Sequence, residues 1–255
     1  MNHQTVKQGD TIAVWFSCGA ASAVAAKRTI KRYGDIATIR VVNNPVAEEH
    51  PDNLRFLRDV EAWLGVEIEF ATNSDWPSAS AVDVWSKRRY MAGIAGAPCT
   101  SLLKKEARRQ WEAANPVDWH VLGFTVEEQD RAERFKRNER ANLIPILIED
   151  EISKQGCFFE LFNAGIKVPE MYTLGYPNAN CIGCVKVTSP TYWNHVRLVN
   201  PEVFEQRAAF SREIGARLVE VHKERVFLDE LDPATMGDPL KNMQFECGIF
   251  CEEKS

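Results

Sequence analysis

The first half of the chain alternates short apolar runs with amphipathic segments. The short runs are rich in β-branched and aromatic residues and predict strands at 11–16, 36–43, 66–71 and 119–123. The amphipathic segments predict helices at 23–33, 52–64 and 101–114. Because strands and helices alternate, we expect an α/β fold of the Rossmann type. Its sheet should be doubly wound and mostly parallel, with helices on both faces.

The second half is less regular. We expect a last strand at 143–148, helices at 152–164 and 201–220, and a loop rich in Gly, Pro and Asn at 169–184. From Pro233 onward the sequence predicts a loose tail that carries cysteines. These features predict a nucleotide-binding core at 1–142 and a cysteine-bearing C-terminal extension at 143–255. The length of 255 residues allows both to form one compact domain.

Composition and charge narrow the class of protein. The net charge of −5 gives no general attraction to nucleic acid, although basic clusters occur, as at Lys87–Arg89. The polar N-terminus has no signal-peptide core, and no run of 18 apolar residues predicts a membrane span. We therefore expect a cytoplasmic protein. In a reducing compartment, seven cysteines favour metal binding or redox chemistry over structural disulfides.

A run of small residues follows the first predicted strand. It comprises Ser17, Cys18, Gly19, Ala20, Ala21 and Ser22. Small residues at a strand-to-helix turn let backbone N–H groups approach an anion, and the helix N-terminus adds partial positive charge. The two serine hydroxyls can donate further hydrogen bonds to phosphate oxygens. The run is therefore a candidate phosphate loop, although a tight turn without a ligand would contain similar residues.

Three cysteines form a candidate metal site. Cys181 and Cys184 flank Gly183 in a spacing that recurs in zinc and iron–sulfur sites. Cys99 is the natural third ligand, because it should lie at the ligand-facing edge of the sheet. The alternatives are a zinc knuckle and reduced thiols without a ligand. A thioredoxin-like redox pair is disfavoured, since that motif opens a helix after a strand.

Further candidates for anion and nucleotide contacts lie near the strand ends. Asn43 ends the second strand and Gly123 the fourth, where ligands bind in such sheets. Arg131 and Arg134 share a helix face and could clamp a phosphate or sulfate, and Lys104 is a similar candidate. The alternative for the arginines is a surface helix, with ion pairs from Glu127 to Arg131 and from Asp130 to Arg134. For Asn43 the alternative is a simple turn.

The phosphate loop resembles the pyrophosphate loop of the PP-loop superfamily (adenine nucleotide α-hydrolase-like). Its form is closest to the branch that contains the PAPS and APS (phosphoadenosine and adenosine phosphosulfate) reductases. Cys18 and Ala21 depart from the superfamily pattern Ser-Gly-Gly-x-Asp-Ser. Gly123 begins a segment similar to one that meets the nucleotide anion in that family, but Phe124-Thr125 stands where the family has an early Arg.

The second half carries further elements of the PAPS/APS reductase pattern. These are Pro145-Ile146, Pro169, Tyr172, Gly175-Tyr176 and the Cys181–Cys184 pair. APS reductases bind a [4Fe-4S] cluster through an adjacent Cys pair and a later Cys-x-x-Cys. Here Cys99 follows Pro98, so three of the four cluster cysteines are present. Glu246-Cys247-Gly248-Ile249 resembles the tail motif whose cysteine is the reductase nucleophile, which makes Cys247 the catalytic candidate.

The resemblance implies an enzyme that binds ATP, PAPS or APS and transfers or reduces sulfur with a [4Fe-4S] cluster. In the reductase version Cys247 attacks the nucleotide's sulfur, and a thioredoxin-like protein is the reductant. In the alternative version ATP, with Mg²⁺, activates a nucleic-acid acceptor, which receives sulfur from a donor, as in tRNA thiolation or DNA phosphorothioation. A homodimer is compatible with both versions. A different class of function is a non-catalytic nucleotide-binding module stabilised by zinc.

Overall fold

The computed structural model describes residues 5–93 and 96–240, and the chain divides into two compact units. The first unit comprises Met1–Pro45, Pro51–Ala71 and Arg108–Glu170, and the second comprises Val46–His50, Thr72–Ala107 and Met171–Ser255. The predicted division at residue 142 differs from this one, because residues 143–170 belong to the first unit and 72–107 to the second. Two segments of the second unit are thus insertions into the sequence of the first.

The first unit is built on a five-stranded parallel sheet with the order β3-β2-β1-β4-β5. Its strands are β1 (Thr11–Phe16), β2 (Thr38–Asn43), β3 (Ile68–Phe70), β4 (Trp119–Val121) and β5 (Leu143–Ile144). Central strand β1 is buried from Ile12 to Phe16, which explains its unbroken apolar run. The register pairs Phe16 with Asn43, so both strands end together at the carboxyl edge of the sheet.

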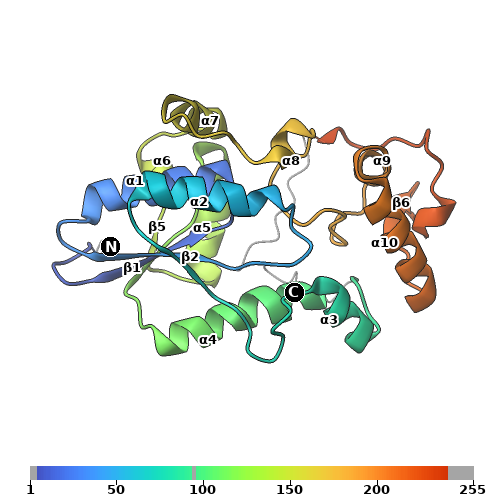
Figure 1. The fold of residues 1–255 in the computed structure, drawn as a ribbon, viewed down its shortest axis with the longest axis horizontal. Coiled ribbons are helices and arrows are strands. Elements are labelled where there is room, and N and C mark those ends of the chain that lie inside the picture. The colour runs from blue at the N-terminus through green and yellow to red at the C-terminus, as the bar shows by residue number, and fades with distance from the viewer. Residues whose placement is uncertain (1–4, 94–95, 241–255) are drawn as a thin grey trace. The chain divides into compact units, whose positions relative to one another are not determined.

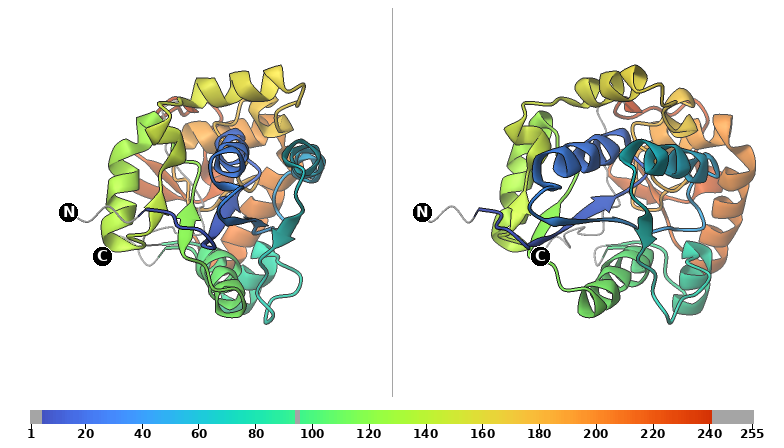
Figure 2. Two further views of the ribbon diagram at one scale, coloured as in Figure 1. Left: turned by 90° about the vertical axis from the view of Figure 1, so that its left-hand side faces the viewer. Right: turned by 60° about the vertical axis from the view of Figure 1, so that its left-hand side comes forward.

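Helices cover both faces of this sheet. Helices α1 (Ala20–Tyr33) and α2 (Asp52–Leu64) lie on one face, and α4 (Ala107–Ala114) lies on the other (Figures 1 and 2). Successive residues of β1 point to opposite faces: the Phe16 ring lies 6.0 Å from Phe56 of α2, and the Trp15 ring lies 5.4 Å from Trp111 of α4. The predicted doubly wound α/β fold is therefore confirmed.

The remaining elements of the first unit follow β4 and β5. They are η2 (Val126–Glu128), α5 (Gln129–Asn138), α6 (Ile146–Glu149) and α7 (Lys154–Asn163). The expected strand at 143–148 was wrong beyond Ile144. Pro145 has no N–H for a sheet ladder, and a helix begins directly after it.

The second unit is mainly helical. Its elements are α3 (Ala81–Arg88), the π-helix η1 (Thr100–Glu106), α8 (Glu170–Thr173, which begins at the last residue of the first unit), α9 (Pro190–Val199), α10 (Pro201–Ile214), η3 (Leu228–Glu230) and a hairpin of β6 (Val219–Val221) and β7 (Glu224–Val226). The predicted helix at 201–220 ends at Ile214, since Gly215 follows and 219–221 form a strand. The core of the second unit includes three fully buried large side chains, Met171, Tyr192 and Trp193. No helix in the described ranges is long and apolar enough to cross a membrane.

His120 is a buried histidine in the first unit. Its side chain on β4 is 3% exposed, and its Nδ1 accepts a hydrogen bond from Trp15 Nε1 at 3.1 Å. Burial, together with the positive charges of Arg140 and Arg108, lowers the pKa of His120 to about 4. The imidazole is therefore neutral in the folded protein at neutral pH.

We expect His120 to make the folded state sensitive to acid. An unfolded histidine binds a proton near its ordinary pKa of 6.5, whereas the buried ring does so only near pH 4. The contribution of the neutral ring to the free energy of unfolding is complete above pH 6.5. It is lost as the pH falls toward 4, and the loss is on the order of 3 kcal/mol. His120→Asn keeps an acceptor for Trp15 but cannot titrate. Urea unfolding from pH 7.0 to about 4.5 should show the wild type losing more stability than H120N. Equal losses would contradict the assignment.

Candidate functional site

The candidate phosphate loop connects β1 to α1. Ser22 Oγ accepts from the Ser17 backbone N–H at 3.1 Å and donates to the Gly19 carbonyl at 2.9 Å, so this hydroxyl closes the loop on itself. The Ser17 hydroxyl also reaches Ser22 Oγ, at 3.2 Å. Ser17 is exposed, while Cys18 is buried with a positive φ of 55°. The loop therefore has a defined shape that depends on Ser22.

Helix α1 begins earlier than its sequence pattern predicts, at Ala20 rather than Ala23. Gly19 is its N-cap residue and provides no side-chain cap. The helix is 14 residues long and its first turn has no acidic residue. The partial positive charge of this N-terminus is thus not offset by a carboxylate within its own first turn, which suits an anionic ligand.

Asn43 and Gly123 hold the loop from two neighbouring strands. Asn43 is buried, and its Nδ2 donates to the Phe16 carbonyl at 2.9 Å and to Cys18 Sγ at 3.4 Å. A Cβ added to Gly123 would lie only 2.7 Å from the backbone nitrogen of Ser22. The loop backbone approaches Gly123 so closely that only glycine fits there. Both candidates therefore lie at the loop, where the contacts of Asn43 position its backbone.

The two candidate arginines lie on α5. Arg131 pairs with Glu128 at 2.7 Å, and its guanidinium lies 5.0 Å from the Phe124 ring centroid. The expected partner Glu127 instead accepts from the backbone N–H of Lys154 at 3.2 Å. Arg134 is exposed. The ion pair of Arg131 is thus made with the N-cap residue of α5, three positions away rather than four.

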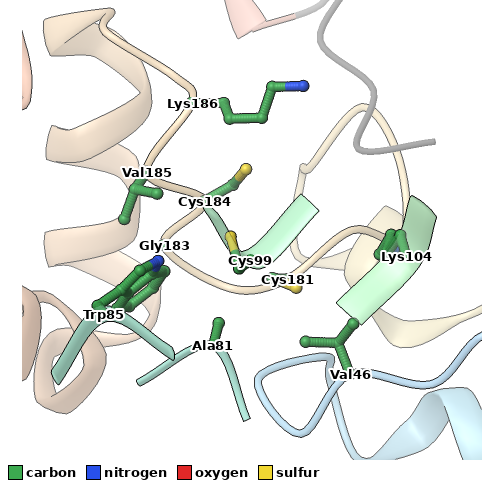
Figure 3. Close-up of a pocket in the computed structure, with 10 residues that line it drawn as sticks. All are labelled: Val46, Ala81, Trp85, Cys99, Lys104, Cys181, Gly183, Cys184, Val185 and Lys186. Carbon is green, nitrogen blue, oxygen red and sulfur yellow. The ribbon is translucent and has the colours of Figure 1, made fainter. Parts of the chain in front are cut away.

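The three candidate cysteine ligands line one cavity within the second unit (Figure 3). Its empty volume is about 350 Å³, including the part that opens to solvent. Apart from the cysteines it is lined by Val46, Ala81, Trp85, Lys104, Gly183, Val185 and Lys186. The fold therefore brings together thiols that lie eighty-two residues apart along the chain.

The Cys181–Cys184 loop is held by hydrogen bonds from its backbone. The N–H of Ile182 donates to the Glu48 carbonyl at 3.0 Å, and the N–H of Cys184 donates to the fully buried Tyr192 hydroxyl at 2.8 Å. Gly183 turns the loop with φ +65°, a value that disfavours other residues. The residues from Ile182 to Cys184 are buried, so their backbone N–H groups need acceptors within the protein, and these two bonds hold the loop in place.

Cys99 enters the cavity from a π-helix. It is the N-cap of η1, and this helix also carries Lys104 to the cavity wall. Lys104 is buried and pairs with Glu49 at 3.3 Å. π-Helices are rare and often occur at functional sites. The nucleotide contact predicted for Lys104 stays a prediction, since this side chain lies in the second unit and the phosphate loop in the first.

The chemistry of the three thiols fits an iron–sulfur centre or zinc. Cys184 is buried, Cys99 and Cys181 are partly exposed, and Val46, Ala81 and Val185 make much of the wall apolar. Within residues 5–93 and 96–240, no three Cys, His, Asp or Glu side chains are arranged closely enough to hold a metal ion. Coordination therefore requires thiol side chains to rotate toward a common centre. Cys247 lies outside the described residues.

Three residues that the sequence did not single out complete the surroundings of the cysteine loop: Glu48, Tyr192 and Arg207. The Glu48 carboxylate caps α3, accepting from the N–H groups of Ala81 at 2.7 Å and Val82 at 3.1 Å. Burial lowers the pKa of Arg207, and the opposing electrostatic interactions, of which that with Glu48 is the largest, offset this only in part. Of these three residues, only Glu48 could have been suspected from the sequence, because it follows shortly after the predicted second strand.

No protein-family model matches the chain, and none of the curated proteins matches it either. One similar solved structure is the U34-tRNA thiolase NcsA from Methanococcus maripaludis with its [4Fe-4S] cluster. It is 11% identical, and the match covers 85% of this chain and 75% of that chain with a TM-score of 0.46. This level of likeness transfers no residue role to the present chain.

Proposed function

We propose that this protein is an adenine-nucleotide-dependent sulfur-transfer enzyme with a three-cysteine iron–sulfur centre. The observation that carries the proposal is the common cavity of Cys99, Cys181 and Cys184. In the described part of the chain, the other two cysteines, Cys18 and Cys157, belong to the first unit. Three thiolates would leave one iron of a [4Fe-4S] cluster without a thiolate from the described residues.

The nucleotide would bind at the carboxyl edge of the sheet in the first unit. The support is the loop at 17–22, closed by Ser22 and followed by the uncapped N-terminus of α1. Backbone N–H groups and the exposed Ser17 hydroxyl would hold the phosphates. Asn43 and Gly123 would keep the loop in shape. Arg131 and Arg134 are the candidates for further contacts with the anion.

Of the two sulfur-transfer versions, we favour ATP-dependent thiolation. An acceptor oxygen would attack the α-phosphorus of ATP and release pyrophosphate. Sulfide from a donor would then displace AMP, so that sulfur replaces oxygen in the acceptor. A bound iron–sulfur cluster would supply a site that holds sulfide. The protein's own residues would bind the nucleotide at 17–22 and hold the thiolates at 99, 181 and 184.

The reductase version and the zinc-stabilised module make different demands. Reduction of PAPS or APS requires Cys247 as the nucleophile and a thioredoxin-like reductant. The sequence motif at 246–249 favours this version, although it lies outside the described residues. The zinc-stabilised module requires only that the three thiolates bind zinc. Metal content and nucleotide preference therefore separate the three candidates.

Anaerobic reconstitution tests the metal centre. We expect brown protein with a broad absorbance at about 400 nm and about four iron atoms per chain. Cys99→Ala, Cys181→Ala and Cys184→Ala should each lose more than about half of the iron, since each removes a ligand. The matched control is Cys157→Ala. Cys157 is buried in α7, and burial raises the pKa of its thiol to about 12.

Colourless wild-type protein that retains about one zinc would favour the non-catalytic module over the enzyme. Full iron content in C99A would remove Cys99 from the ligand set. A loss of iron in C157A equal to that in the three cavity variants would show that cysteine removal acts through folding rather than coordination.

Calorimetric titration with ATP, APS and PAPS tests the nucleotide loop. Gly123→Ala should weaken binding of the preferred nucleotide by about tenfold or more, because the new Cβ displaces the loop backbone at Ser22. The matched control is Gly156→Ala in α7, where a Cβ would lie 3.3 Å from the Ile152 side chain. It should bind like the wild type. Preference for ATP supports thiolation, whereas preference for PAPS or APS supports the reductase. Unchanged affinity in a folded G123A would refute the loop assignment.

A further inference from the structure

Arg207 is a buried cation in the second unit. It lies on α10, is 4% exposed, and its guanidinium sits 4.9 Å from the ring centroid of Trp85. Its Nε has no hydrogen-bond partner, and the described residues offer it no ion pair within 4.0 Å. A buried charge is strongly unfavourable unless an opposite charge compensates it. A further negative group close to Arg207 would therefore be stabilising.

The acidic side chain that approaches this region already has other partners. The Glu48 carboxylate accepts hydrogen bonds from Ser80 Oγ at 2.8 Å and from the N–H groups of Ala81 and Val82. These three donors belong to the N-cap and first turn of α3. The Glu48 carboxylate therefore accepts its hydrogen bonds from that helix and not from the Arg207 guanidinium.

Arg207 lies directly behind the cysteine loop. A Cβ added to Gly183, between Cys181 and Cys184, would lie 3.4 Å from Arg207 Cγ. Trp85, on which the guanidinium rests, is itself part of the cavity wall (Figure 3). The aliphatic part of the Arg207 side chain thus packs against the backbone that joins two of the three thiols.

We infer that Arg207 compensates the negative charge of a thiolate-bound centre in this cavity. The inference rests on the proposed iron–sulfur function and assigns Arg207 the role of a positioning and charge-balancing residue. Three thiolates around a [4Fe-4S] core give a net negative charge, which becomes more negative when the cluster is reduced. A fixed cation behind the loop stabilises both states, and the reduced state more. It should therefore slow cluster loss and raise the reduction potential.

The apo and cluster-loaded proteins should respond in opposite ways when the charge is removed. In the apo protein, Arg207→Met replaces a buried cation that has no ion-pair partner among the described residues with an apolar side chain of similar length. Its urea midpoint should be equal to or higher than that of the wild type. In the reconstituted protein the same change should speed iron release to a chelator by about tenfold. It should also shift the reduction potential, followed by electron paramagnetic resonance, to a more negative value.

Three further variants act as controls. Arg207→Lys keeps the positive charge and should restore most of the retention and the potential. Arg207→Gln removes the charge but keeps a polar head, so it replaces R207M if that variant does not fold. Arg212→Met removes a charge from the same helix. Arg212 is an exposed arginine that pairs with Asp229 at 2.7 Å, and R212M should behave like the wild type.

The inference is overturned if R207M or R207Q releases iron at the wild-type rate with an unchanged potential. It is also overturned if apo R207M has a lower urea midpoint than the wild type while the bound cluster keeps its iron-release rate and its potential. That result would assign Arg207 a packing role. Failure of the proposed function is a separate result. In that case the wild-type protein itself would bind no iron–sulfur cluster, whatever residue stands at 207.

Discussion

The polar backbone of the Cys181–Cys184 loop lies in an apolar interior, and this constraint organises the second unit. Buried N–H groups must find acceptors, and here they find the Glu48 carbonyl and the Tyr192 hydroxyl. Glu48 in turn caps α3 with its carboxylate, so one residue connects the cysteine loop to that helix. Tyr192 is completely buried on α9, where Trp193 donates to the Val187 carbonyl at 2.7 Å. The position of the loop that carries two thiols is thereby determined by contacts from two other segments of the chain, 46–50 and α9.

A second constraint acts in the first unit, where the strands of the parallel sheet end together. Phe16 and Asn43 are paired in register, and Asn43 bonds to the carbonyl of Phe16 and to Cys18. Gly123 approaches the same loop from the next strand. Small residues are needed at 17–22 because the backbone must pass between these neighbours. A backbone that bulky side chains do not cover also suits the close approach of an anion. The fold and the proposed nucleotide contact therefore favour the same residue types at this loop.

Charge in the second unit is distributed unevenly between its buried groups. Lys104 is buried at the cavity and paired with Glu49, so its charge is compensated within the protein. For Arg207, the described residues supply the face of the Trp85 ring and no ion pair within 4.0 Å. A cation over an aromatic face gains some stabilisation, but less than a buried guanidinium loses on leaving water. This difference between two buried cations beside the same thiols is what makes Arg207, rather than Lys104, informative about the charge of the site.

Local patterns determined the architecture of the first unit. The apolar run at 11–16, the helix at 52–64 and the small residues at 17–22 are each specified by neighbours within a few positions, so periodicity and turn composition predict them. The structure confirmed the parallel sheet and corrected the strand beyond Ile144. Cysteine spacing also indicated Cys181 and Cys184 as a pair, and the expected position of Cys99 at the edge of the sheet suggested it as the third thiol.

Tertiary structure alone decided the rest. No local pattern shows that 46–50 and 72–107 belong with 171–240, because that grouping depends on packing between residues far apart along the chain. The π-helix after Cys99, the place of Lys104 on the cavity wall and the buried position of Arg207 depend on the same packing. From the sequence alone, Arg207 is indistinguishable from an exposed arginine of a charged helix. Only the contacts with Gly183 and Trp85 place its charge behind the cysteines.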